Sequence, residues 1–258
     1  MAELKFIGTG SGKTSLNRFH SSFLISTSDY KLLIDAGDGV SKALLSQGVD
    51  FTSIDGILFT HLHPDHYTGL AVLIVQMKMY NRQDQLDLFV NSELMRVIEK
   101  FLINSYLFPE RMGFPIAYRK FNNNIRFKIS DEISFIPRQN SHLQSVSKLQ
   151  KYKKQSFSCS SLLLQVKNKI VHYTGDIGQK NDLLLFKEFT TDFLISEITH
   201  IKLQDILDAF DEDNLPAKII FTHISDDDED RMGAFLSNLP EEQRDKFIIA
   251  KDGLKITF

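Results

Sequence analysis

The sequence predicts an α/β protein in which strands and helices alternate along one domain covering residues 1–258. Three observations support this class. Short apolar runs of strand length alternate with stretches that have the periodicity of an amphipathic helix. Turn residues separate several neighbouring runs closely enough for hairpins. Polar residues that can bind metal follow the apolar runs between residues 61 and 223, so a single site would draw on most of the chain.

The composition is typical of a soluble globular protein, with 42% hydrophobic and 24% charged residues in a chain of 258. The formal net charge of −3 provides no overall positive field for binding nucleic acid. The single cysteine, Cys159, excludes an internal disulfide and a cysteine-based zinc site. Met1 leads directly into a strand-like run, and no apolar run approaches the roughly 18 residues of a membrane span. We therefore expect a cytoplasmic protein without a membrane anchor.

The first fifth of the chain predicts three strands and a helix. The strands are expected at residues 4–7, 22–27 and 31–35, and the helix is expected at 40–47, ended by Gly48. The loop after the first strand, residues 8–21, begins with three glycines, Gly8, Gly10 and Gly12. We call it the glycine-rich loop; it lacks the spacing of a phosphate-binding P-loop. We therefore expect a tight connection between strands, which can still line an active site.

The remaining segments continue the alternation. Further strands are expected at 57–59, 86–90, 116–118, 125–129, 133–137, 160–166, 169–173, 193–196, 219–222 and 254–258. Further helices are expected from Pro64, at 70–77, from Ser92 to about residue 106, at 182–187, at 201–210, and from Ser225.

Three segments carry unusual composition. The four lysines between Lys148 and Lys154 predict a solvated face or a mobile loop. The acidic run from Asp226 to Glu229 opens a helix, where it offsets the helix dipole and needs no functional role. The bulky apolar loop at 106–115 is compatible with ordinary packing, with a substrate flap, or with a subunit contact in a homodimer.

One short stretch, between residues 61 and 66, holds three imidazoles and one carboxylate. His61 and His63 are two positions apart just past a strand, so an extended backbone places both on the same side. Pro64 favours an extended conformation at His63 and itself suits the first position of a helix. Asp65 and His66 then fall in that helix's first turn. Four ligands therefore converge on one small volume, which predicts a metal site.

Three further candidate ligands, His142, Asp176 and His223, each follow a predicted strand, the place where open sheets usually put their ligands. With the histidine-rich stretch they supply five histidines and two carboxylates, a number that suits two divalent metals sharing a carboxylate. Asp35 ends a buried strand. We expect it either to hold a ligand histidine or its surrounding backbone, or to cap the following loop and helix.

These motifs resemble the metallo-β-lactamase superfamily. The matching segments are, in order, Leu33-Ile34-Asp35-Ala36-Gly37, Thr60-His61-Leu62-His63-Pro64-Asp65-His66, His142, Tyr173-Thr174-Gly175-Asp176 and Phe221-Thr222-His223. The resemblance implies a four-layer αβ/βα sandwich, with two mixed sheets packed face to face and helices outside. It also implies one metal held by His61, His63 and His142, a second held by Asp65, His66 and His223, and Asp176 as the bridge.

The donor set favours zinc, and manganese and iron bind similar ligands. The superfamily's diiron oxidoreductases have a carboxylate at the position of His63, which argues against redox chemistry. Two metals about 3.5–4 Å apart can hold a hydroxide between them and lower its pKa towards neutrality. The resemblance therefore implies a metal-dependent hydrolase, and Asp65 is expected to help steer the proton.

Within the superfamily, the pattern is most similar to ribonuclease Z-like phosphodiesterases. The glycine-rich loop, Arg18 and Glu197 carry this resemblance, and Glu197 is expected to act in catalysis. One departure concerns a proton-donating histidine that the family places between that glutamate and the last ligand. Here only His200 lies between Glu197 and His223, and it is too near the glutamate in sequence to match.

A second departure concerns the family's tRNA-binding arm. His142 and Asp176 are only 34 positions apart, which leaves no room for it. We therefore expect a small substrate, such as a cyclic or nucleotide phosphodiester, and disfavour RNA.

Two other functions fit the same ligands. One is hydrolysis of a carboxylic ester, lactone, thioester or β-lactam, although the glycine-rich loop and Glu197 fit the phosphodiesterase branch better. The other is a metal-stabilised binding or sensing protein. The roles of His20 and His200 stay open.

Overall fold

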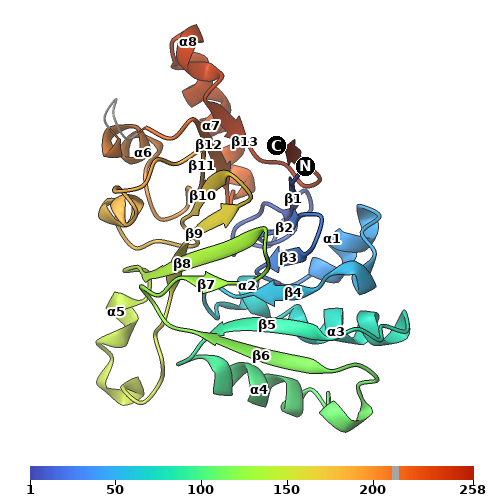
Figure 1. Cartoon of the computed structure of the whole chain (residues 1–258). Helices are drawn as coiled ribbons and strands as arrows, with labels where there is room; N and C mark the ends of the chain where they lie inside the picture. Colours follow the sequence, from blue (N-terminus) through green and yellow to red (C-terminus); the bar gives the residue numbers. More distant parts are fainter. Residues whose placement is uncertain (211–214) are drawn as a thin grey trace.

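The computed structural model describes residues 1–210 and 215–258 and contains two seven-stranded mixed sheets (Figure 1). The first sheet consists, in spatial order, of β14 (Lys255–Thr257), β1 (Glu3–Gly8), β2 (Ser22–Ser26), β3 (Lys31–Ile34), β4 (Gly56–Leu58), β5 (Leu86–Asn91) and β6 (Ile116–Phe121). The second consists of β13 (Phe247–Ile249), β12 (Lys218–Thr222), β11 (Phe193–Glu197), β10 (Lys169–Tyr173), β9 (Ser160–Val166), β8 (Ile133–Gln139) and β7 (Phe127–Lys128). In each sheet one half is antiparallel and the other half is parallel.

Helices cover the outer face of each sheet because parallel neighbours need a crossover connection. On the first sheet lie α1 (Val40–Ser46), α3 (Leu70–Met79) and α4 (Met95–Asn104), and on the second lie α6 (Leu203–Ala209) and α7 (Asp226–Asn238). Shorter helices and 3₁₀ turns fill the connections: α2 (Pro64–Tyr67), α5 (Gln144–Ser147), α8 (Glu241–Arg244), η1 (Phe51–Ser53), η2 (Pro109–Arg111), η3 (Gln150–Tyr152) and η4 (Lys180–Leu184). No helix in the described ranges is long and apolar enough to cross a membrane.

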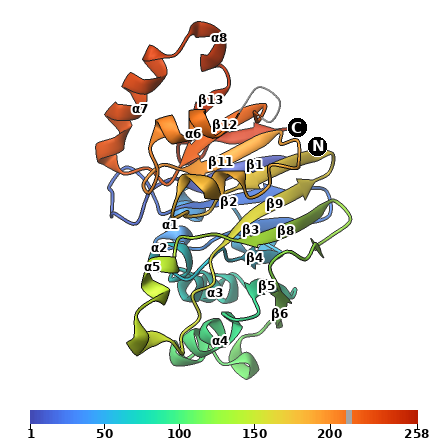
Figure 2. The same ribbon diagram turned by 90° about the vertical axis from the view of Figure 1, so that its left-hand side faces the viewer.

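A core of buried apolar side chains joins the two sheets. Phe23 of β2 packs edge-on against Tyr173 of β10, with ring centroids 4.9 Å apart, and both side chains are buried. Phe6 and Phe135 extend the same cluster from β1 and β8. The order of layers is therefore helix, sheet, sheet, helix, which confirms the expected αβ/βα sandwich. The turned view shows α7 and α8 at one end of the molecule and α3 and α4 at the other (Figure 2).

Most predicted elements are present, with shifted bounds. The helix expected from Ser92 begins only at Met95, because the Asn91 side chain accepts the Glu93 N–H (3.1 Å) and holds a turn there. The strand expected at 125–129 is reduced to β7, and the helix expected at 182–187 is the 3₁₀ turn η4. The sequence analysis missed β13 and α8, which are too short to give a periodic signal.

Candidate metal centre

The candidate ligands come from loops that follow β4, β8, β10 and β12, and these loops meet at one edge of the sandwich. The first loop has the predicted local conformation. His63 is extended (φ −71°, ψ 149°) and precedes α2, in which Pro64 takes the first position. The His66 N–H donates to the His63 carbonyl (2.9 Å), which turns Asp65 and His66 back towards the two earlier histidines.

Two ligand groups form at this edge, and within each group the ligand atoms lie within 4.8 Å of one another. Metal site 1 consists of His61, His63, His142 and Asp176, and metal site 2 consists of Asp65, His66, His223 and Asp176. These groups contain the seven residues that the sequence predicts as ligands, in the predicted two sets, and their role as ligands stays a prediction.

Asp176 serves both sites through different oxygens. Its Oδ2 lies 3.9 Å from His61 Nε2 and 3.7 Å from His142 Nε2. Its Oδ1 lies 3.2 Å from His66 Nε2 and 3.3 Å from His223 Nε2. One carboxylate thus faces two ligand groups, one with each oxygen, which is the geometry of a bridging ligand.

The donor atoms fit divalent metals. Ligands about 2.0–2.1 Å from a tetrahedral zinc ion are separated from one another by about 3.4 Å, close to the spacing around Asp176. Among the described residues, His61 Nε2, His66 Nε2 and Asp176 Oδ1 are buried without a well-aligned hydrogen bond, although the last two atoms lie 3.2 Å apart. Buried polar atoms are rarely left unpaired, so these three point to a group that the protein alone does not supply.

The two sites differ in electrostatics. In metal site 1, burial lowers the pKa of His142 to about 4 and holds the pKa of His61 well below its ordinary value, so both rings are neutral and ready to act as ligands. In metal site 2, burial opposes the charge on His66, but the carboxylates of Asp176 and Asp35 outweigh it and raise the pKa of His66. Metal binding at metal site 2 must therefore displace a proton.

Asp35 is fully buried and orients His66. Its Oδ2 accepts from His66 Nδ1 (2.8 Å) and from Thr60 Oγ1 (2.8 Å), and its Oδ1 accepts the Thr60 N–H (2.8 Å). With Nδ1 donating to Asp35, the Nε2 lone pair of His66 is directed at the metal site. Of the two roles expected for Asp35, the structure shows the one that holds a ligand.

Glu197 and His200 form a hydrogen-bonded pair that was not predicted from the sequence. The turn after β11 brings His200 Nδ1 to 3.0 Å from Glu197 Oε1, and this hydrogen bond raises the pKa of His200. The Glu197 carboxylate is buried and also accepts the N–H groups of Thr199 (2.6 Å) and His200 (2.9 Å). The His200 ring lies 4.7 Å from the ring of His142. The signal in the sequence was the i,i+3 spacing of the two residues.

His20 has a different environment. Its Nδ1 is hydrogen-bonded to the carbonyl of Ser11 (2.7 Å), within the glycine-rich loop, and His20 does not line the cavity at the metal centre. We therefore assign His20 to the support of that loop.

A cavity of about 350 Å³ opens onto the metal ligands. Beside the ligands it is lined by Ser11, Gly12, Lys13, Thr199, His200 and Ser225. Gly12 lies so close to the site that an added Cβ would be 3.0 Å from Asp65 Oδ2. The glycine-rich loop therefore lines the site, as expected. The apolar loop at 106–115 does not line it, and its Met112 and Phe114 pack into the core of the first sheet.

The acidic start of α7 does more than offset the helix dipole. Asp227 pairs with Lys13, Asp226 accepts from Ser15 Oγ (2.7 Å), and Glu229 pairs with Arg18 (3.2 Å). These contacts fasten the glycine-rich loop to the helix that follows His223. The prediction that this run offsets the helix dipole and disfavours a polyanion did not include these contacts with the loop.

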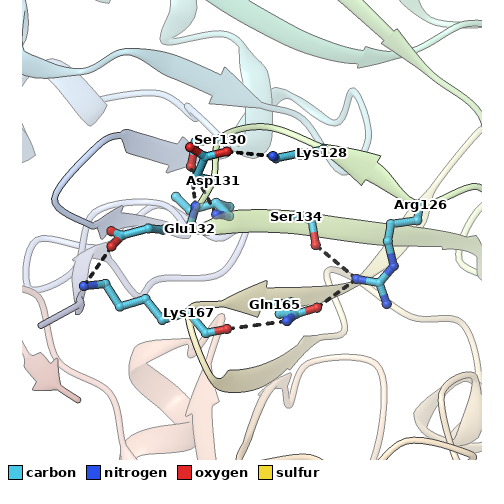
Figure 3. Close-up of a pocket in the computed structure, with 9 residues that line it drawn as sticks. Arg126, Lys128, Ser130, Asp131, Glu132, Ser134, Gln165 and Lys167 are labelled. Carbon is cyan, nitrogen blue, oxygen red and sulfur yellow. Dashed lines mark hydrogen bonds and ion pairs between the residues drawn. The ribbon is translucent and has the colours of Figure 1, made fainter.

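A second cavity, of about 270 Å³, lies over β7, β8 and β9 and shares no lining residue with the first (Figure 3). Its lysines are each paired with a carboxylate, Lys128 with Asp131 (2.6 Å) and Lys167 with Glu132 (3.0 Å). Arg126 donates to two neutral side chains. In the part of the chain that the structure describes, neither candidate metal-binding group includes a residue that lines this second cavity.

Comparison with known proteins identifies the family. The protein-family model described as "Anti-Pycsar protein Apyc1" matches residues 2–238, which is most of the chain and includes every ligand named above. The chain belongs to the Anti-Pycsar protein Apyc1 family.

Curated relatives of this Apyc1-family chain include ribonuclease Z proteins, the branch that the sequence motifs resemble. Ribonuclease Z of Aeropyrum pernix is 34% identical over 115 residues, which cover 44% of the chain and 36% of the relative. The chain thus matches only about a third of the length of that curated relative. The similarity confirms the predicted resemblance to the ribonuclease Z branch.

Two solved structures share the fold across the Apyc1-family chain. The metallo-β-lactamase fold protein YhfI from Bacillus subtilis has a TM-score of 0.74 at 18% identity and covers 99% of this chain and 98% of its own. The short form of human tRNase Z, ELAC1, has a TM-score of 0.73 at 17% identity with the same coverage. Both likenesses confirm the metallo-β-lactamase fold.

Proposed function

We propose that this protein is a dinuclear metal-dependent phosphodiesterase that hydrolyses a small or nucleotide phosphodiester. The observation that carries the proposal is the division of the two Asp176 oxygens between two complete ligand groups at the wall of a cavity. The similarity to ribonuclease Z supports phosphodiester chemistry. Zinc suits the imidazole and carboxylate donors best. Two divalent cations held here would lower the pKa of a water and polarise a phosphoryl oxygen.

The residues of the chain divide the remaining work. Asp35 fixes the orientation of one ligand ring, and Asp65, at the cavity wall, is placed to accept a proton from the attacking water. His200 lies on the cavity wall with Nδ1 engaged by Glu197, so its Nε2 is the free donor for the oxygen of the leaving group. In this proposal the buried Glu197 acts through His200.

Two features favour a small substrate over RNA. The cavity of about 350 Å³ is of the size that holds a mononucleotide-sized ligand. Three carboxylates of α7, those of Asp226, Asp227 and Glu229, lie along the glycine-rich loop and neutralise its cations Lys13 and Arg18. A polyanion crossing this edge would gain little from those cations.

The direct test is an assay of the purified, zinc- or manganese-loaded protein on bis(p-nitrophenyl) phosphate and on nucleotide phosphodiesters. We expect turnover by the wild-type protein. In His63→Ala we expect kcat/KM to fall by about 100-fold or more, because losing a metal ligand should cost more than losing a residue that only hydrogen-bonds to a ligand. Lactones, thioesters and nitrocefin serve as the comparison panel. Absence of turnover above the His63→Ala background, or strong turnover on that panel alone, would reject the proposal.

For the leaving-group role of His200, we expect His200→Ala to lose about 100-fold in kcat on a nucleoside phosphodiester, whose alkoxide leaving group needs a proton. The loss on bis(p-nitrophenyl) phosphate should be small, because p-nitrophenolate leaves without one. Glu197→Ala should show the same pattern more weakly and keep two bound metals. Equal losses on the two substrates would contradict proton donation by His200.

A further inference from the structure

One buried side chain joins the main chains of two candidate metal ligands, His142 and Asp176, that lie in the loops after two different strands. Asn140 directly follows β8 and is 2% exposed. Its Oδ1 accepts the main-chain N–H of His142 (3.1 Å). Its Nδ2 donates to the main-chain carbonyl of Asp176 (2.9 Å). Asn140 itself contributes no atom to either metal site.

The chemistry of this contact requires an amide. A single planar group must accept at one end and donate at the other, which neither a carboxylate nor an apolar side chain can do. The Nδ2 group also lies 3.4 Å from the Thr174 carbonyl and 3.1 Å from Ser161 Oγ, so it is surrounded by oxygens on the side of β10. A negative charge placed there would face two carbonyl dipoles.

A second contact ties the same two loops together farther from the metals. The Asp182 carboxylate accepts from Ser141 Oγ (2.6 Å) and from the N–H of Gly178 (3.0 Å). At Gly178 the backbones approach so closely that an added Cβ would lie 2.6 Å from the Ser141 carbonyl oxygen. The loop that carries His142 and the loop that carries Asp176 are therefore joined at two places, and the Asn140 contact is the one nearer the candidate ligands.

We propose that Asn140 is a positioning residue that sets the spacing of His142 and Asp176 and thereby the metal affinity of metal site 1. The distance at issue is the 3.7 Å between His142 Nε2 and Asp176 Oδ2. Metal site 2 depends on Asn140 less, because contacts independent of Asn140 hold two of its histidines: Asp35 holds His66 and Thr199 Oγ1 holds His223 Nδ1 (2.9 Å). The inference rests on the proposed metal centre, and the identity of the substrate does not enter it.

The test measures metal binding by Asn140→Asp and Asn140→Ala. Asn140→Asp keeps the acceptor for His142 and loses the donor for Asp176. Metal-free protein is titrated with Co²⁺, whose visible spectrum reports each coordination sphere, and with Zn²⁺ against a competing chelator. We expect both variants to weaken one of the two metals by about 10- to 100-fold and the other by a clearly smaller factor, because Asp176 serves both sites. The altered Co²⁺ band should be the one that is also lost in His142→Ala.

Asn91→Ala is the matched control. Asn91 is also buried (3% exposed), lies at the end of β5, and also accepts the N–H two residues ahead, that of Glu93 (3.1 Å). It should lower the thermal stability of the metal-free protein, as Asn140→Ala does, and leave both metal affinities unchanged.

Unchanged affinities in both Asn140 variants would overturn the inference, as would equal weakening of the two metals in proportion to lost stability. Fewer than two metals in the wild-type protein would reject the dinuclear centre itself, and the inference would fall with it. The wild-type titration thus separates failure of the proposed function from failure of this inference.

Discussion

Asp176→Ala is expected to remove the dinuclear centre and the activity together. Among the residues that the structure describes, Asp176 is the one that belongs to both ligand groups, so its loss would open one coordination position in each site. Burial disfavours the charge on Asp176, yet His223 and His66 hold its pKa well below the usual range, so it is an anion at any working pH. Metal-ion stabilisation of the transition state supplies several kcal/mol, which corresponds to a loss of about 10³-fold or more in kcat/KM.

The measurement pairs metal content per chain with turnover of bis(p-nitrophenyl) phosphate. Asp50→Ala is a suitable control, because it removes a carboxylate that caps η1 through the Thr52 N–H (2.8 Å) and should change neither quantity. Two bound metals with retained activity in Asp176→Ala would show that the bridge is wrongly assigned.

The ligand set could be predicted because its signals are local. The conformation of His63 follows from the proline after it, and the helical turn at Asp65 and His66 follows from the same proline. His142, Asp176 and His223 follow strands, and strand ends are recognisable from apolar runs alone. The resemblance to a known superfamily then divided these residues between two metals. The predicted fold layers depended on the same resemblance, because alternation alone does not specify the order of strands.

The supporting residues could not be predicted in this way, because their partners are set by how distant loops approach one another. Asn140 can contact Asp176 because β8 and β10 both pair with β9, which brings the loops after them together. The acidic residues at the start of α7 are already explained by their position at a helix N-terminus. Nothing in the sequence therefore indicated that they also contact the glycine-rich loop. The role of His200 was left open because the residue is too near Glu197 to match the family pattern, although a tight turn brings the two side chains together. The contacts of Asn140 and α7 are long-range and gave no signal in the sequence, whereas the contact of His200 is local and depends on the shape of that turn.

Asp35→Ala is expected to have the largest effect on stability and a marked effect on one metal. The substitution removes the acceptor of four buried donors, namely His66 Nδ1, Thr60 Oγ1, the Thr60 N–H and, at 3.4 Å, the Tyr173 hydroxyl. Breaking a buried charged contact of this kind costs about 3–5 kcal/mol of unfolding free energy. Residue 35 also has a positive φ of 58°, which alanine adopts less readily than aspartate or asparagine. Metal site 2 should weaken by about 10- to 100-fold as His66 loses its orientation.

Denaturant unfolding of the metal-free protein and chelator competition by the metal-loaded protein measure the two effects separately. Asp35→Asn keeps the shape and tolerates the positive φ, so it should recover part of the stability while metal site 2 stays weak, because an amide cannot accept from all of these donors. Asp192→Ala is the control: its carboxylate accepts the Ile170 N–H (2.8 Å) and pairs with Lys169 (2.7 Å) at the start of β10, the end away from Asp176, and its loss should cost about 1 kcal/mol without altering metal affinity. Wild-type metal affinity in Asp35→Ala would mean that His66 is oriented by the surrounding packing, and that the carboxylate serves stability alone.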